Sequence, residues 1–116
     1  LIVDAHSFSS KPLPHEPDQS PNRPDICIGT DSFHTPHALS DLAMKAMKDQ
    51  GFTVEKDRPF SGSIVPAKYL NNDRNVSSVM IEVNRSLYMN EDTGQKIAVF
   101  DDVKMRIQHA LLAICQ

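Results

Sequence analysis

Short apolar segments of strand character alternate with two segments of helical spacing, and this alternation constrains the fold more than any other feature. The strands are predicted at Leu1–His6, Asp25–Gly29, Phe52–Glu55 and Val76–Val83. Continuous apolar runs are typical of strands that are buried on both faces, as in a sheet covered by helices. The sequence therefore predicts an α/β fold with a mixed, largely parallel sheet layered by helices.

Both helical segments have recognisable ends. Thr35 is the expected N-cap of the first helix, Pro36 its first helical residue, and Gly51 the residue just beyond its carboxyl end. The second helix is expected to begin at Asp101, as its cap, and to end near Ile114. Apolar residues recur at helical spacing in both segments, so each helix has one face that can cover a sheet.

A long loop is predicted between the first two strands. Ser7–Pro24 contains five prolines among polar residues, which excludes a regular helix or a central strand. Loops of this length inside a compact domain are usually functional or mobile. This loop leaves directly from His6, so it is expected to lie close to any site that uses this histidine.

Length and composition limit the class of protein. The 116 residues fit a single domain, expected over residues 1–116. Because the chain begins within a predicted strand at Leu1, we expect it to be part of a longer protein. A formal charge of −3 gives no basic surface for nucleic acid, and no apolar run is long enough for a membrane span. Cys27 and Cys115 lie in apolar contexts, so both are expected to be buried free thiols in a reducing cytoplasm.

The segment Val79–Met89 places ionisable groups within an apolar strand. Glu82 lies in its middle, and Asn84 and Arg85 follow. A carboxylate in such a place is unfavourable without a partner or a function. Strand geometry puts Glu82 and Asn84 on one face. Ligands bind at the carboxyl ends of strands in such sheets, so Glu82 and His6 are expected to share a crevice if their strands are neighbours.

Each of these residues has a structural alternative. A single histidine at a strand end, such as His6, is more often a hydrogen-bonded structural residue than a metal ligand. Asp4 shares a face with His6 and fits a carboxylate that orients the imidazole, but it fits a cap at the strand end equally well. Glu82 and Arg85 form, in the alternative interpretation, an ion pair that fixes a loop.

The other chemical groups are interpreted as structural or exposed. His34 and His37 are predicted to be a solvated helix start, because no third metal ligand stands nearby. His15 and His109 are predicted to be surface residues. Cys27 lies within an apolar strand, which does not suit a reactive thiolate. The dispersed glycines form no phosphate-binding loop.

Four segments, taken together, resemble the N-formylglutamate amidohydrolase family. They are Asp4-Ala-His-Ser-Phe, Pro24-Asp-Ile-Cys-Ile-Gly-Thr-Asp, Pro59-Phe-Ser-Gly-Ser-Ile-Val-Pro and Ile81-Glu-Val-Asn-Arg-Ser-Leu-Tyr-Met. They occur in this order over nearly the whole chain, which makes them far more specific together than singly. The family is similar in fold to zinc carboxypeptidases and aspartoacylases. The resemblance therefore implies a zinc-exopeptidase-like (phosphorylase/hydrolase-like) fold, of which this chain is the carboxyl-terminal, incomplete portion.

The resemblance also implies roles for individual residues. His6 is similar to the last zinc ligand of the family, Glu82 to its general base, and Asp4 to a carboxylate behind the ligand. The candidates for contact with substrate are Arg85, Asn84 and Arg58, for its carboxylates, and Phe60, Ser61 and Gly62, for the pocket wall. Arginine suits a carboxylate because its planar guanidinium offers two parallel donors.

The implied activity is zinc-dependent hydrolysis of N-formyl-L-glutamate to formate and glutamate, in the cytoplasm and in histidine degradation. A catalytic zinc needs about three protein ligands. Only His6 matches, so the other ligands are expected in a preceding segment, and the chain alone is expected to be inactive. Sheet surface left open by such a missing segment predicts self-association.

Two other functional interpretations stay open. In the first, the chain is a non-catalytic α/β module or fragment in which Glu82, Arg85 and His6 form a structural polar network. In the second, it has the zinc fold but acts as a carboxypeptidase or a deacylase of another N-acyl amino acid. In the enzymatic interpretations the only partner expected is a small N-acyl amino acid, with neither nucleic acid nor membrane.

Overall fold

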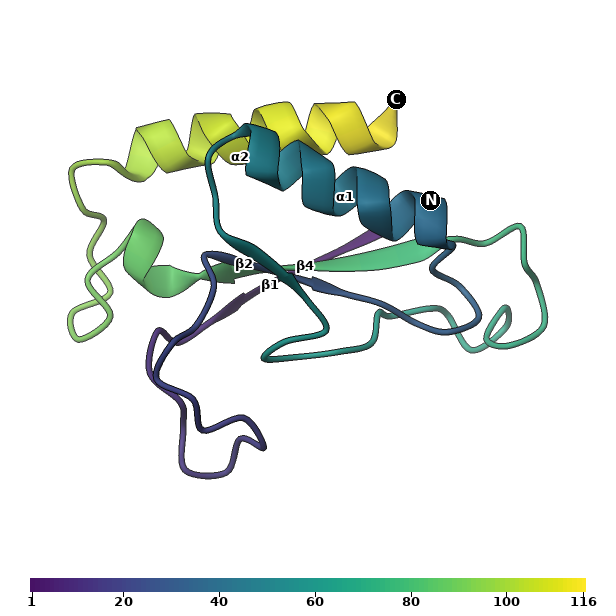
Figure 1. The fold of residues 1–116 in the computed structure, drawn as a ribbon, viewed down its shortest axis with the longest axis horizontal. Helices are drawn as coiled ribbons and strands as arrows, with labels where there is room; N and C mark the ends of the chain where they lie inside the picture. The colour runs from purple at the N-terminus through teal and green to yellow at the C-terminus, as the bar shows by residue number, and fades with distance from the viewer.

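The computed structural model describes residues 1–116 and contains one four-stranded sheet with two helices (Figure 1). The strands are β1 (Ile2–Phe8), β2 (Ile26–Gly29), β3 (Val54–Lys56) and β4 (Ser78–Asn84). The helices are α1 (His37–Asp49), α2 (Phe100–Cys115) and the short 3-10 helix η1 (Arg85–Leu87). This order confirms the predicted alternation, although β1 continues beyond His6 to Phe8.

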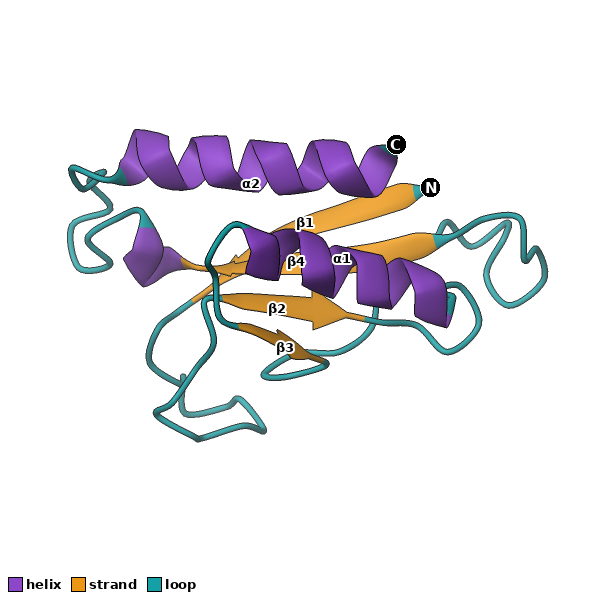
Figure 2. Cartoon of the chain, turned by 45° about the horizontal axis from the view of Figure 1, so that its top comes forward, coloured by secondary structure: helices purple, strands orange, loops and turns teal.

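The sheet is mixed, as predicted, but its two halves run in opposite directions. The strand order is β1-β4-β2-β3 (Figure 2). β1 pairs with β4 in parallel and β2 with β3 in parallel, whereas β2 and β4 are antiparallel. The carboxyl ends of β1 and β4 therefore lie at the same end of the sheet as the amino end of β2. The strand-end argument thus holds for β1 and β4 but does not extend to β2 and β3.

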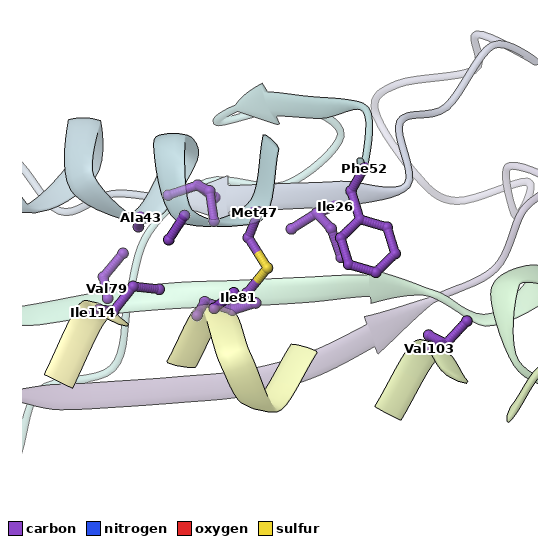
Figure 3. Close-up of a cluster of buried hydrophobic side chains, with 11 residues drawn as sticks. Ile26, Ala43, Met47, Phe52, Val79, Ile81, Val103 and Ile114 are labelled. Carbon is purple, nitrogen blue, oxygen red and sulfur yellow. The ribbon is translucent and has the colours of Figure 1, made fainter. Parts of the chain in front are cut away.

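Both helices cover the same face of the sheet, and the hydrophobic core lies between the helices and the sheet (Figures 2 and 3). The core side chains are Ile26, Ile28, Val79 and Ile81 from strands, Ala43, Ala46 and Met47 from α1, Phe52, and Val103, Ala110 and Ile114 from α2. Burial of each larger aliphatic side chain stabilises the fold by roughly 1.5–3 kcal/mol. Because strand residues alternate, the residues between these core positions face away from the helices.

The loops that follow β1 and β3 lie on the side of the sheet opposite the helices (Figure 1). The first of these loops is the proline-rich segment, residues 9–24, and the second spans residues 57–66. β1 lies at the edge of the sheet, and its residues Ala5, His6 and Ser7 are exposed. The predicted self-association depends on this open edge and stays a prediction.

The start of α1 corrects one prediction. α1 begins at His37, with Pro36 in the N-cap position and no side-chain cap. The hydroxyl of Thr35 instead donates to the carbonyl oxygen of Ser78 at 2.6 Å, so this contact with β4 replaces the expected cap. Gly51 has φ of +82°, which confirms it as the residue that ends the helix in a left-handed conformation.

The start of α2 differs from the prediction as well. α2 begins at Phe100 with Val99 in the N-cap position, which puts Asp101 inside the first turn rather than at the cap. A carboxylate there still stabilises the helix, because it faces the positive end of the helix dipole. Neither helix is both long and apolar enough to cross a membrane.

Candidate functional site

His6 of β1 and Glu82 of β4 lie directly opposite each other on neighbouring strands. On β2, Cys27 is opposite Glu82, and on β3, Glu55 is opposite Cys27. Opposite residues of paired strands project to the same face of a sheet. A row of four side chains therefore crosses the sheet on the face away from the helices. β1 and β4 are neighbours, which is the condition under which His6 and Glu82 were expected to share a crevice.

Glu82 is buried without a partner. Its residue exposure is 8%, and its Oε2 atom makes no hydrogen bond. Burial raises the pKa of Glu82 above its usual value; positive charge from His6 and Arg85 opposes this shift, whereas Asp4 adds to it. Buried groups with a perturbed pKa and an unsatisfied polar atom are typical of functional sites.

Asp4 orients the imidazole of His6. His6 Nε2 donates to Asp4 Oδ1 at 2.7 Å, and Asp4 Oδ2 accepts a bond from the backbone N–H of Ile64 at 3.0 Å. The carboxylate is thus fixed by the loop over residues 57–66, and the ring is fixed by the carboxylate. The His6 side chain is 50% exposed, so its Nδ1 atom is available to a ligand.

Arg85 and Asn84, which follow Glu82, differ in how far their donors are used. Arg85 Nη2 makes one long contact, 3.5 Å to the carbonyl oxygen of Ser7, and its buried Nε has no partner. Asn84 is buried, and its side chain binds the carbonyl oxygen of Pro24 and the N–H and hydroxyl of Ser86. Arg85 therefore has donors left for a ligand, whereas the amide of Asn84 holds the start of η1.

Arg58 anchors the proline-rich loop. Its Nη1 lies 2.7 Å from both carboxylate oxygens of Glu55, and its Nε lies 2.9 Å from Asp18 Oδ2. Its Nη2 donates to the carbonyl oxygen of Asn22 at 2.7 Å. All three nitrogens are thus engaged by β3 and by the loop, which leaves Arg58 poorly placed to bind a substrate carboxylate.

Phe60, Ser61 and Gly62 lie in the loop over the same sheet face. The Phe60 ring packs edge-on against Phe8, with centroids 6.0 Å apart. Gly62 has φ of +92° and donates its N–H to the carbonyl oxygen of Thr30 at 3.1 Å, while Ser61 is exposed. These three residues therefore form the border of the site, and only Phe60 packs inward.

The two cysteines differ in exposure. Cys27 is fully buried and donates to the carbonyl oxygen of Phe60 at 3.1 Å; burial raises its pKa to about 11. It is therefore a neutral thiol at physiological pH, in agreement with the prediction that it is not a nucleophile. Cys115 is exposed, which corrects its predicted burial, because Ile114 takes the core-facing position in the last turn of α2.

His34 corrects the prediction of a solvated helix start. It is 1% exposed, and its Nε2 accepts the N–H of Asn71 at 2.9 Å. Nδ1 therefore carries the proton and donates to the carbonyl oxygen of Val76 at 2.7 Å. His34 is a neutral link between two loop segments, whereas His37, His15 and His109 are exposed as predicted.

Sequence reasoning did not single out Arg23 and Glu16, which form a buried ion pair in the proline-rich loop. The side chain of Arg23 is 1% exposed, and its guanidinium lies 5.8 Å from the ring centroids of both Phe8 and Phe60. The only signal in the sequence was the position of this pair in a loop that leaves from the site strand.

The residues present do not fit a zinc ion by themselves. No three histidine, cysteine, aspartate or glutamate side chains are grouped closely enough to hold a metal. A catalytic zinc needs about three protein ligands. Within this chain His6 is a single donor, and its neighbour Asp4 is engaged in orienting it.

The fold and this sheet face define a mixed α/β protein with a buried carboxylate and an oriented histidine at a polar site. A family model described as N-formylglutamate amidohydrolase matches residues 1–89, which run from β1 through η1 and include His6, Glu82 and Arg85. The chain belongs to the N-formylglutamate amidohydrolase family. This membership confirms the resemblance found in the sequence.

One solved structure supports the fold. The chain is similar to the crystal structure of N-formylglutamate amidohydrolase from Ralstonia eutropha JMP134, with a TM-score of 0.75 and 24% identity. The similarity covers 97% of this chain and 40% of the chain in that structure. At this identity it establishes the fold alone. Among curated proteins, no sequence matches significantly.

Proposed function

We propose that this chain forms part of an amidohydrolase that hydrolyses N-formyl-L-glutamate to formate and L-glutamate. Membership of the family supports a hydrolase of this class. The observation that carries the proposal is the unpartnered carboxylate of Glu82, buried directly opposite His6. A structural strand has no need for such a carboxylate, and its burial is costly without a function.

In the proposed reaction, Glu82 acts as the general base. It takes a proton from the water whose oxygen adds to the formyl carbon, and it passes that proton to the amine nitrogen as the carbon–nitrogen bond breaks. A free glutamate has a pKa of about 4.3, and burial raises the pKa of Glu82. The upward shift makes the carboxylate a stronger base than a free glutamate.

Arg85 binds a carboxylate of the substrate in this proposal. Its guanidinium has donors that the fold does not use, and it follows directly on the strand that carries Glu82. A carboxylate bound there places the rest of the substrate next to the His6–Glu82 row. Phe60, Ser61 and Gly62 border the substrate site in this proposal, whereas Asn84 and Arg58 support it through the bonds described above.

We also propose His6 as one ligand of a zinc ion, with Asp4 holding its ring. Because this chain groups no three ligands, the others must come from other residues of the protein. On the same basis the chain alone is inactive. The zinc-exopeptidase-like fold, the cytoplasmic location and the place in histidine degradation belong to this proposal as well.

A substrate panel tests the proposal. The intact encoded protein is incubated with N-formyl-L-glutamate, N-acetyl-L-glutamate and a peptide with a C-terminal glutamate, and the released formate, acetate or amino acid is measured. We expect formate from N-formyl-L-glutamate at a rate at least about tenfold above either other product, a preference of about 1.4 kcal/mol. Preferential cleavage of the acetyl compound or the peptide indicates the related deacylase or carboxypeptidase, and no product at all indicates a non-catalytic module.

A further inference from the structure

This inference rests on the proposed function, whose substrate carries two carboxylates. Such a substrate needs two cationic partners. Arg85 supplies the first partner. Arg58 is held by Glu55, Asp18 and Asn22 and has no nitrogen left. The remaining arginine over this sheet face is Arg23, which lies in the proline-rich loop.

Arg23 lies next to the site. Its guanidinium lies over the ring of Phe8, 5.8 Å from the centroid, and Phe8 is two residues beyond His6 on the same face of β1. Asn84, which lies opposite Phe8, is likewise two residues beyond Glu82 on β4. Arg23 therefore lies beside the pair Phe8 and Asn84, which is the next pair on this face beyond His6 and Glu82.

Arg23 and Arg85 are attached to the same stretch of backbone. Arg85 contacts the carbonyl oxygen of Ser7 at 3.5 Å. Arg23 Nη1 donates to the carbonyl oxygen of Ser9 at 3.0 Å. The two guanidinium groups are thus both held at the carboxyl end of β1, by carbonyl oxygens two residues apart.

The contacts of Arg23 already include the side chain of a glutamate. Its Nη2 donates to Glu16 Oε2, and the Glu16 side chain is only 9% exposed. The buried Nε of Arg23 has no partner. Guanidinium binds any carboxylate through the same donors. Glu16 therefore presents to Arg23 the same group that the side chain of a bound glutamate would present.

We propose that Arg23 binds the side-chain carboxylate of an N-acyl dicarboxylic amino acid, and that Glu16 fills this position until the substrate replaces it. The exchange leaves one carboxylate on the guanidinium before and after binding, so Arg23 is never buried without a counter-charge. It also makes the proline-rich loop the element that selects an acidic side chain.

Two variants and a neutral isostere test this proposal. The intact protein is assayed for formate release from N-formyl-L-glutamate and from N-formyl-L-glutamine, in the wild type, Arg23→Gln and Glu16→Gln. We expect the wild type to prefer the acid by roughly 10- to 100-fold in kcat/KM, the value of a charge-assisted hydrogen bond. Arg23→Gln is expected to lose this preference through a raised KM for the acid. Glu16→Gln, which removes the competitor, is expected to increase the preference several-fold.

A measurement without substitution covers the case in which a variant does not fold. The side-chain Nε–H resonance of Arg23 is followed by NMR in the wild-type protein during titration with N-formyl-L-glutamate and with N-formyl-L-glutamine. We expect the resonance to shift with the acid only. An unshifted resonance, or an unchanged preference in a folded Arg23→Gln variant, overturns the role of Arg23 while formate release still supports the proposed function. Absence of formate from both compounds contradicts the proposed function, and the titration then decides the role of Arg23 alone.

Discussion

His6 and Glu82 lie opposite each other on two parallel neighbouring strands, although they are far apart in the sequence. The pairing of β1 with β4 brings the oriented imidazole and the unpartnered carboxylate onto one sheet face. Helices cover only the other face of the sheet, and the loops over residues 9–24 and 57–66 lie on this one (Figure 1).

The Glu82→Gln variant is expected to unfold less readily than the wild type. Folding raises the pKa of Glu82, so the ionised form destabilises the fold at neutral pH, and this cost falls as the pH drops toward the raised pKa. We expect a gain of about 1 kcal/mol in the free energy of unfolding at pH 7, measured by urea denaturation. Glu55→Gln, in the same row, is the control and should lose stability because Glu55 binds Arg58. Any loss of stability in Glu82→Gln contradicts this account.

Replacement of His34 by alanine is expected to destabilise the fold by about 2–3 kcal/mol, since it removes a buried side chain and leaves two backbone groups without their hydrogen-bond partner. These groups are the carbonyl of Val76 and the N–H of Asn71. His37→Ala is the matched control, because His37 is exposed, and should change the free energy of unfolding by less than about 0.5 kcal/mol. Equal effects of the two substitutions in thermal or urea denaturation would disprove the linking role of His34.

The two thiols are expected to react at very different rates. Cys115 is exposed, whereas Cys27 is buried with its pKa raised to about 11. Iodoacetamide at pH 7.5 should therefore label Cys115 in the native protein and label Cys27 only after denaturation. Mass spectrometry of the peptides after digestion measures both. Labelling of Cys27 at the rate of Cys115 in the folded protein contradicts its burial.

Glu91 is expected to make the fold less stable in acid. Partial burial acts to raise its pKa, but hydrogen bonds from the hydroxyl and N–H of Ser10 outweigh burial and hold the pKa below its usual value. A carboxylate with a lowered pKa contributes stability above its unfolded pKa and loses it as the pH falls through the folded value. Ser10→Ala should therefore weaken the fall in unfolding free energy below pH 4.5. An identical pH profile in the variant would show that this contact does not stabilise the fold.

Much of the fold followed from local patterns. Apolar runs and helical spacing predicted the order of strands and helices. Gly51 marked the end of α1, because the backbone there adopts a left-handed conformation that favours glycine. The antiparallel pairing of β2 with β4 had no local signal, since strand direction depends on how the connecting segments cross the sheet.

The site could be predicted only where one residue stood out within its own element. Glu82 and His6 were recognisable because a carboxylate and a histidine lay on apolar strands. The contacts of Thr35 with Ser78 and of His34 with Asn71 are tertiary, and the contact of Arg23 with Glu16 closes an irregular loop. No spacing rule along the sequence reports such contacts, so the first two were assigned wrongly and the third was overlooked.

The general-base role of Glu82 is the central claim, and formate release by Glu82→Gln in the intact protein tests it most directly. The wild type and Glu55→Gln are the references, and metal content is measured alongside kcat for N-formyl-L-glutamate. A lost general base should lower kcat by about 10²- to 10⁴-fold while metal content and KM stay close to those of the wild type. Turnover by Glu82→Gln within tenfold of the wild type would contradict the claim, since that is less than the loss of about 10² expected for a missing base.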